Sequence, residues 1–215
     1  MSEPIAGKPG HRLEWLVWGA LTVTVVLIGV AYVRVRLEER TLKKPLDPIG
    51  VVPPFSLTNQ LGRVVTLSNL LGQVWVADVI FTRCPISCEK MTQRMKLLEA
   101  DVPSRAPVKF VSITADPGYD TPGIFTQYAE KRNLDQRRWH FLTGIKNDVY
   151  ALSVGGLKFA VLDSEDKTIP DNFFIHSTQF ALVDKKGRIR GYFEGTDDEE
   201  RKQLALAIRK LVREN

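Results

Sequence analysis

Residues 15 to 33, WLVWGALTVTVVLIGVAYV, form a run of 19 residues without a charged side chain. A helix of about 20 such residues spans the ~30 Å hydrocarbon core of a bilayer. The run is apolar on all faces, and Trp15, Trp18 and Tyr32 lie near its ends, as aromatic side chains do at membrane interfaces. A cleaved signal peptide has a shorter apolar region and a small-x-small cleavage site. We therefore expect a retained membrane anchor, neither a signal peptide nor a buried core helix.

The charges that flank this run bear on topology. Two basic residues precede it and five follow it: Lys8 and Arg12, then Arg34, Arg36, Arg40, Lys43 and Lys44. This count favours a cytoplasmic C-terminal part, although long domains can be translocated despite such a bias. The short stretch before the run does not resemble an organelle transit peptide, which points to a bacterial membrane.

Composition limits the class of partner. The 30 basic and 25 acidic residues give a formal net charge of +5, but the two signs are interleaved along the chain. A nucleic-acid binder would instead show a basic stripe. We therefore expect no nucleic-acid partner.

The sequence divides into four segments and predicts one α/β domain. Residues 1–14 form a short tail, 15–33 the anchor, 34–54 a proline-containing linker and 55–215 the folded domain. The first half of the domain is predicted to contain a β-hairpin in 55–72, a buried strand at 74–81 and a helix from Pro85 to about Ala100. Strand 108–116, a helix from 120 or 121 and the short strand WHFLTG follow. The chain then forms a hairpin in 177–195 and a last helix capped by Thr196 with Glu199. Alternating strands and helices predict a thioredoxin-like mixed β-sheet sandwiched by helices.

Both cysteines of the chain lie in the stretch FTRCPISCEKM, four positions apart, where the buried strand gives way to a helix. On the first turn of a helix this spacing puts both sulfurs on one face, and the helix N-terminus favours thiolates. We expect Cys84 to be the more easily deprotonated of the two. A structural disulfide that closed so short a loop would constrain the unfolded chain little. The spacing therefore indicates a reactive or metal-binding dithiol at Cys84 and Cys88.

A metal site needs a further ligand, and His176 is the favoured candidate. His11 precedes the anchor, and His140 lies in WHFLTG without an evident path to the cysteines. In a thioredoxin-like fold, the loop that enters the strand STQFALVD faces the cysteine turn, so His176 is placed to reach both sulfurs. Two thiolates and one imidazole suit Cu(I) and can hold Cu(II) with another weak ligand. Zinc also accepts this set.

Two other residues are candidates for secondary roles at this site. Met91 follows Cys88 by three positions, but its helical spacing with Met95 and Leu98 favours core packing over metal binding. Asp171 precedes His176 by five positions and is a candidate to orient the imidazole.

These motifs resemble those of the Sco/SenC family, membrane-anchored thioredoxin-fold proteins associated with copper delivery to cytochrome c oxidase. The resemblance extends from PPFSLTNQLGRVVTLSNLLGQVW through FTRCPISC, VSITADPGYDTP and RRWHFLTG to IHSTQFALVDKKGRIRGYFEG. It implies that Cys84, Cys88 and His176 bind one copper ion per chain, on the periplasmic side of a bacterial inner membrane spanned once by the anchor. Members usually carry an acidic residue and a proline where Ile86 and Glu89 stand here, and a glycine where Val79 or Ile80 stands. These departures alter the surroundings of the ligands.

Two functions follow from this resemblance and the dithiol. The first is a copper-binding assembly factor that passes copper, alone or with electrons, to the dinuclear copper centre of a haem-copper oxidase. The second is a membrane-tethered thiol-disulfide reductase that uses Cys84 and Cys88 to reduce copper-site cysteines of the oxidase. Both require a thiol reductant, and only the first requires His176. A thiol peroxidase is disfavoured because Thr82 stands only two residues before Cys84, not three, and no proline precedes it suitably.

Overall fold

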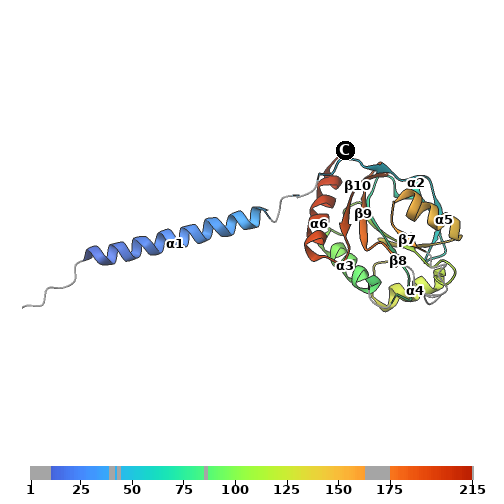
Figure 1. The fold of residues 1–215 in the computed structure, drawn as a ribbon, viewed down its shortest axis with the longest axis horizontal. Helices are drawn as coiled ribbons and strands as arrows, with labels where there is room; N and C mark the ends of the chain where they lie inside the picture. Colours follow the sequence, from blue (N-terminus) through green and yellow to red (C-terminus); the bar gives the residue numbers. More distant parts are fainter. Residues whose placement is uncertain (1–10, 39–41, 43–44, 85–86, 163–174, 215) are drawn as a thin grey trace, which may run out of the picture. The chain divides into compact units, whose positions relative to one another are not determined.

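The computed structural model describes residues 11–38, 42, 45–84, 87–162 and 175–214. The chain divides into two compact units, Met1–Thr41 and Leu42–Asn215. The first unit contains helix α1 (His11–Glu38; Figure 1). Within this helix, Trp15–Arg34 has a length and composition sufficient to cross a membrane, with a mean hydropathy of 2.2. Two threonines inside this stretch form hydrogen bonds with the backbone of the same helix. Thr22 Oγ1 donates to the carbonyl of Trp18, and Thr24 Oγ1 donates to that of Ala20. Such bonds let hydroxyls sit in an apolar helix. The predicted N-terminal apolar helix is therefore present.

The second unit is built on one mixed sheet of eight strands in the order β1-β10-β9-β4-β5-β6-β2-β3. The strands are β1 (Gly50–Val51), β2 (Ser56–Asn59), β3 (Val64–Thr66), β4 (Val74–Ile80), β5 (Val108–Thr114), β6 (Trp139–Thr143), β9 (Gln179–Val183) and β10 (Arg188–Glu194). β4, β5 and β6 run parallel, and the other pairs are antiparallel. A separate ribbon pairs β7 (Val161–Leu162) with β8 (Ile175–His176).

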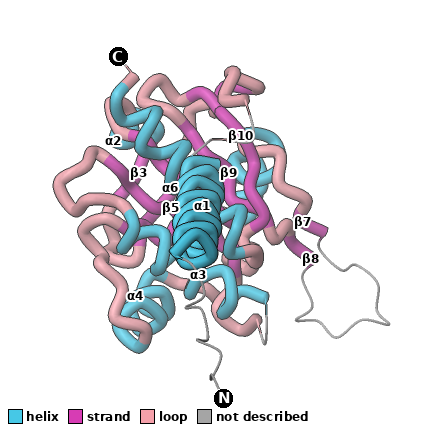
Figure 2. The backbone as a smooth tube through the Cα atoms, turned by 90° about the vertical axis from the view of Figure 1, so that its left-hand side faces the viewer, coloured by secondary structure: helices cyan, strands magenta, loops and turns pink. Residues whose placement is uncertain are grey.

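The helices cover this sheet. They are α2 (Leu67–Leu70), α3 (Ser87–Asp101), α4 (Pro122–Lys131), α5 (Lys146–Tyr150), the π-helical turn η1 (Ala151–Gly156) and α6 (Asp198–Arg213). α3 and α6 pack side by side against the sheet, whereas α4 contacts β6 and α5 contacts β2 (Figures 1 and 2). All seven residues of β4 are buried because helices cover a strand that is central in the sheet. The predicted thioredoxin-like mixed sheet is confirmed.

Local signals account for several boundaries. Thr121 caps α4 by accepting a hydrogen bond from the amide of Ile124, and a proline occupies the first turn, as predicted. The cap of α6 differs from the prediction. Asp197, not Thr196, accepts the amide protons of residues 199 and 200, because the Thr196 hydroxyl donates instead to Glu194 at 2.8 Å.

The second unit also includes residues ahead of Phe55. Leu46 and Val52 are buried in the core, and β1 pairs with β10 through Gly50 and Ile189. This pairing adds an edge strand at one side of the sheet. The four domain limits drawn from the sequence stay predictions.

Candidate functional site

The two cysteines lie where β4 ends and α3 begins. The Cys84 amide donates to the carbonyl of Phe81 at 3.1 Å, which closes a tight turn directly after β4. The Cys84 sulfur then accepts the amide proton of Cys88 at 3.3 Å and lies 3.2 Å from the Ser87 hydroxyl. Both cysteines are thiols in the structure. The first turn of α3 therefore directs a backbone N–H at the Cys84 sulfur, as the predicted position at a helix N-terminus requires.

Cys88 is the inner member of the pair. Its side chain is 1% exposed, whereas that of Cys84 is half-buried. The hydrogen bond with the Cys84 sulfur and burial raise the pKa of Cys88, and the nearby charges of Cys84 and Asp78 act in the same direction. The Phe81 amide, 3.5 Å from the Cys88 sulfur, opposes this effect. Cys88 is thus kept as a buried thiol beneath a more accessible sulfur.

A buried carboxylate holds the turn that precedes Cys84. Asp120, which is fully buried, accepts hydrogen bonds from the amide and the hydroxyl of Thr82 and from the Thr114 hydroxyl at 2.7 Å. Burial raises the pKa of Asp120, and the bonds from Thr82 and Thr114 counteract that rise. Since Thr114 ends β5 and Thr82 follows β4, this carboxylate ties together the ends of two adjacent parallel strands.

A second contact joins the same two segments at the surface. Arg83 forms an ion pair with Asp116 and lies over the Tyr119 ring, 4.2 Å from its centroid. The Asp116 amide in turn donates to Thr114 Oγ1 at 2.8 Å. Neither these supporting residues nor Asp120 were predicted from the sequence to belong to the site. Asp116, Tyr119 and Asp120 lie in the segment ITADPGYDTP, which places acidic side chains at the carboxyl end of the strand next to the cysteine strand. This segment is the sequence signal that could have identified them.

The structure places only the backbone of His176. It lies in β8 opposite Val161, and the amide of the following Ser177 donates to the carbonyl of Ala160 at 2.7 Å. Its side chain lies outside the described part of the chain, as do Asp171 and Ile86. Within that described part, no three His, Cys, Asp or Glu side chains form a group able to hold a metal ion. The role of His176 as a ligand stays a prediction.

The structure also shows how Met91 and His140 are packed. Met91 is fully buried in the core with Met95 and Leu98, which confirms the core interpretation. His140 lies in β6 with its Nδ1 3.4 Å from the side-chain nitrogen of Asn59. Burial, with a smaller effect of Lys109, lowers the pKa of His140 to about 4.

Glu89, one of the departures from the family pattern, has a structural partner. Arg132 donates to its Oε2 through Nε at 2.9 Å and through Nη2 at 2.5 Å. The Arg132 guanidinium also lies over the Tyr128 ring, 3.6 Å from its centroid, and Tyr128 shares a 2.8 Å hydrogen bond with Thr92. This ion pair therefore links the first half of α3 to the C-terminal end of α4.

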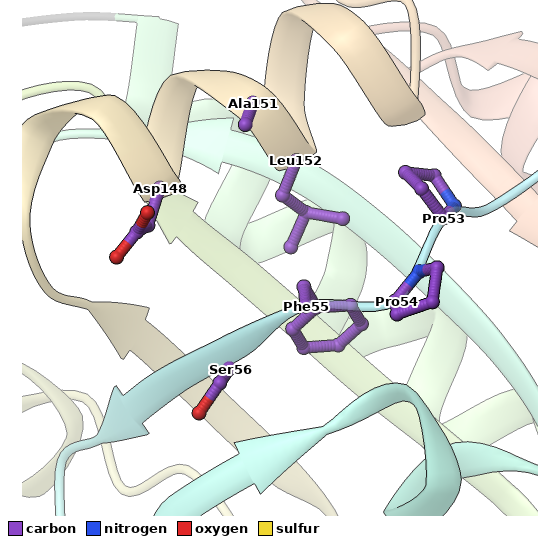
Figure 3. A pocket seen from close by; sticks show the side chains of 7 residues that line it. All are labelled: Pro53, Pro54, Phe55, Ser56, Asp148, Ala151 and Leu152. Atoms are coloured by element: carbon purple, nitrogen blue, oxygen red, sulfur yellow. The ribbon is translucent and has the colours of Figure 1, made fainter.

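A cavity of about 500 Å³ lies apart from these residues. Its lining consists of Pro53, Pro54, Phe55, Ser56, Asp148, Ala151 and Leu152. Figure 3 shows Leu152 pointing from η1 toward the Phe55 ring, with Asp148 on the preceding helix α5. Neither Cys84 nor Cys88 is among the described residues that line this cavity.

Comparison with known proteins bears on this site. The SCO1/SenC family model matches residues 43–213. The SCO1 protein homolog of Bacillus subtilis is 31% identical over 155 residues, which cover 71% of this chain and 78% of that protein.

Solved structures show the same fold. BsSco, a member of the Sco family of cytochrome c oxidase assembly proteins in which a disulfide switch was identified, is 27% identical with a TM-score of 0.68, over 79% of this chain and 98% of that chain. ScoI of Bradyrhizobium japonicum, solved with copper bound, is 23% identical with a TM-score of 0.62, over 74% of this chain and 98% of that chain. Because the family model spans most of the sequence and a relative exceeds 30% identity, the chain belongs to the SCO1/SenC family.

Proposed function

We propose that this protein is a membrane-anchored copper-binding assembly factor that delivers copper to the dinuclear copper centre of cytochrome c oxidase. The observation that carries the proposal is the dithiol at the start of α3, where the Cys88 amide bonds to the Cys84 sulfur. Membership of the SCO1/SenC family supports it, and one relative of the same fold was solved with copper bound. Copper is the cargo, one ion per chain, with Cys84, Cys88 and His176 as its ligands.

The donor chemistry fits Cu(I). Thiolates are soft ligands, and a site of two thiolates and one imidazole has the low coordination number that Cu(I) accepts. Cys84 is accessible enough to receive the ion first, and the buried Cys88 completes the pair. Since the pKa of Cys88 is raised, copper must displace the proton of this thiol when it binds.

We place the domain outside the cytoplasm, tethered by α1 to a bacterial inner membrane. The length and composition of Trp15–Arg34 support a single crossing. The positive charges that follow α1 oppose this orientation, but a domain of this length can be translocated against such a bias. A periplasmic dithiol requires a thiol reductant, because disulfides persist in that compartment.

A second candidate function is thiol-disulfide reduction, which the unequal exposure of the two sulfurs favours. The Cys84 thiolate would attack a disulfide of the oxidase, forming a mixed disulfide and releasing one target thiolate. Cys88, after losing its proton, would attack Cys84, releasing the second target thiolate and leaving a Cys84–Cys88 disulfide. Two electrons pass from the dithiol to the target, and a thiol reductant must restore them.

Titration of the reduced full chain in detergent with Cu(I), against a competing chelator, separates these functions. One tight copper per chain, weakened by His176→Ala and lost in the Cys84→Ser, Cys88→Ser variant, supports copper delivery. His140→Ala serves as the matched control, because this histidine packs against Asn59 and should not affect copper affinity. Weak binding that is indifferent to His176, together with reduction of a protein disulfide, would support the reductase instead.

A further inference from the structure

The domain has two opposite ends, and the cysteine turn occupies one of them. α3 starts beside Cys88 and runs for 15 residues, so its last residue, Asp101, lies about 21 Å away. There the chain turns back into β5, whose first residue Val108 pairs with Val74 at the start of β4. We call this far end, formed by the Val102–Ala106 loop and the last two turns of α6, the base of the domain.

The base contains an apolar groove with a basic rim. Its volume is about 310 Å³, and it is lined by Val102, Pro103, Ala106, Ile208, Arg209, Val212 and Arg213. The side chains of Val102 and Ile208 are buried beneath it, whereas both arginines are exposed. The Arg209 Nη2 donates to the carbonyl of Asp101 at 2.9 Å, which holds its guanidinium across the gap between α3 and α6.

The charge around this groove is predominantly positive. Exposed basic side chains at the base are Arg105, Arg209, Lys210 and Arg213. The acidic side chains of the same two segments already take part in ion pairs, Asp101 with Arg201 and Glu214 with Arg190. An apolar slot rimmed by arginines matches a ligand that has an anionic head and an apolar body.

The chain enters the domain at this same end. Arg190 Nε donates to the carbonyl of Leu46, and its Nη1 donates to Glu214 Oε2 at 3.0 Å. Lys185 bonds to the carbonyls of Val212 and Glu214 at 2.8 and 2.7 Å, and Val212 lines the groove. The contacts that hold Leu46 and the lining of the groove therefore share the last turn of α6.

Covalent reach limits how far the base can lie from a bilayer. The candidate span ends at Arg34, and four more residues of α1 add about 6 Å. Leu46 follows Glu38 by eight positions, which span at most about 28 Å when extended, so the total reach is about 34 Å. The intervening and adjacent sequence is basic, with Arg34, Arg36, Arg40, Lys43 and Lys44. Basic clusters beside a membrane-spanning helix attract acidic lipid headgroups.

We propose that the groove binds an acidic phospholipid, so that the base of the domain docks on the anionic surface of the membrane that holds α1. This inference depends on the membrane anchor of the proposed function. Arg209 and Arg213 contact the phosphate, and the apolar lining receives the upper part of an acyl chain. The cysteine turn, at the far end of α3, then points away from the lipid toward an approaching partner domain.

The test is hydrogen–deuterium exchange of the full chain in nanodiscs, either of phosphatidylcholine alone or with phosphatidylglycerol added. We expect amides in 102–107 and 209–213 to exchange at least about threefold more slowly in the anionic discs, and high salt to remove this difference. Arg209→Glu with Arg213→Glu should abolish it. Lys146→Glu with Lys158→Glu is the matched control, because it makes the same change of charge at exposed positions away from the groove. Unchanged exchange in β4 and β5 shows that each variant is folded.

The outcomes separate the docking from the anchor. Lipid-dependent protection that only the arginine pair removes supports the docking. Equal exchange in both discs, or protection that survives the arginine changes, overturns it and leaves the anchor intact. A full chain that enters neither type of disc overturns the anchor and the docking together.

Discussion

Replacement of Asp120 tests whether the turn before Cys84 is held by a buried carboxylate. The side chain is fully buried and accepts hydrogen bonds from three donors: the amide and hydroxyl of Thr82 and the hydroxyl of Thr114. Asp120→Ala leaves all three donors without this acceptor. An unsatisfied buried polar group costs about 1–3 kcal/mol. The Thr114 hydroxyl is buried, whereas Thr82 is half-buried and water can reach its donors, so the free energy of unfolding should fall by about 2–4 kcal/mol.

Asp120→Asn should cost less, for a reason that the geometry makes specific. The asparagine oxygen can still face Thr82, and its amide can donate to the Thr114 hydroxyl oxygen. What is lost is the charge assistance of three bonds, about 1 kcal/mol each. Burial destabilises the charged form of Asp120 and raises its pKa, so removal of this charge offsets part of that loss. We expect a net cost of about 1–2 kcal/mol.

Urea denaturation followed by circular dichroism measures both costs, and a Cu(I) titration measures their effect on the site. Because Thr82 stands two residues before Cys84, we expect Asp120→Ala to weaken Cu(I) binding more than Asp120→Asn does. A cost below about 1 kcal/mol for Asp120→Ala would refute this account, as would a greater cost for the asparagine variant.

Three further predictions concern pH and packing. The pKa of His140 falls from 6.5 to about 4 on folding, so the unfolded chain binds more protons than the folded chain between these pH values. The stability that this histidine contributes is full above pH 6.5 and is lost toward pH 4, by at most about 3 kcal/mol. Urea denaturation at several pH values should therefore show a shallower acid dependence for His140→Gln than for the unchanged protein. A Cβ on Gly195 would lie 2.5 Å from the Thr178 carbonyl oxygen, so Gly195→Ala should cost about 1–3 kcal/mol in thermal or urea unfolding, whereas Gly155→Ala, with nothing within 4 Å, should cost much less. Because Cys88 must lose its proton, the apparent Cu(I) affinity should rise by up to about tenfold per pH unit for that proton, and a pH-independent affinity in competition titrations would contradict the raised pKa.

The elements with strong periodicity were predictable from the sequence. β4 was recognisable because a continuous β-branched and aromatic run has few alternatives to a buried strand. The hairpin of β9 and β10 was equally clear, because two alternating runs flank a Lys-Lys-Gly turn. In the structure Gly187 has the positive φ of 76° that glycine adopts readily. The cysteine junction followed from these patterns, because a helical repeat begins directly after β4.

What the sequence could not show were contacts between distant segments. Thr82 and Asp120 are 38 residues apart, and no local pattern states that one bonds to the other. β1 has only two residues, too few for any periodicity, and it is a strand only because β10 offers an unpaired edge. The cap of α6 differs from the predicted one for a related reason. Thr196 and Asp197 are both good caps, and the competing bond from Thr196 to Glu194 decides between them.

These supports determine what a test of His176 can report. Hydrogen bonds from Thr82 to Asp120 stabilise the turn before Cys84, and the ion pair of Glu89 with Arg132 stabilises the first half of α3. Both supports come from chain between residues 82 and 132, and neither involves β8. The two sulfurs therefore keep their arrangement when the histidine is replaced. A loss of copper affinity in His176→Ala then measures the missing imidazole ligand and not a collapsed dithiol, whereas a loss in an Asp120 variant measures the geometry of the sulfurs themselves.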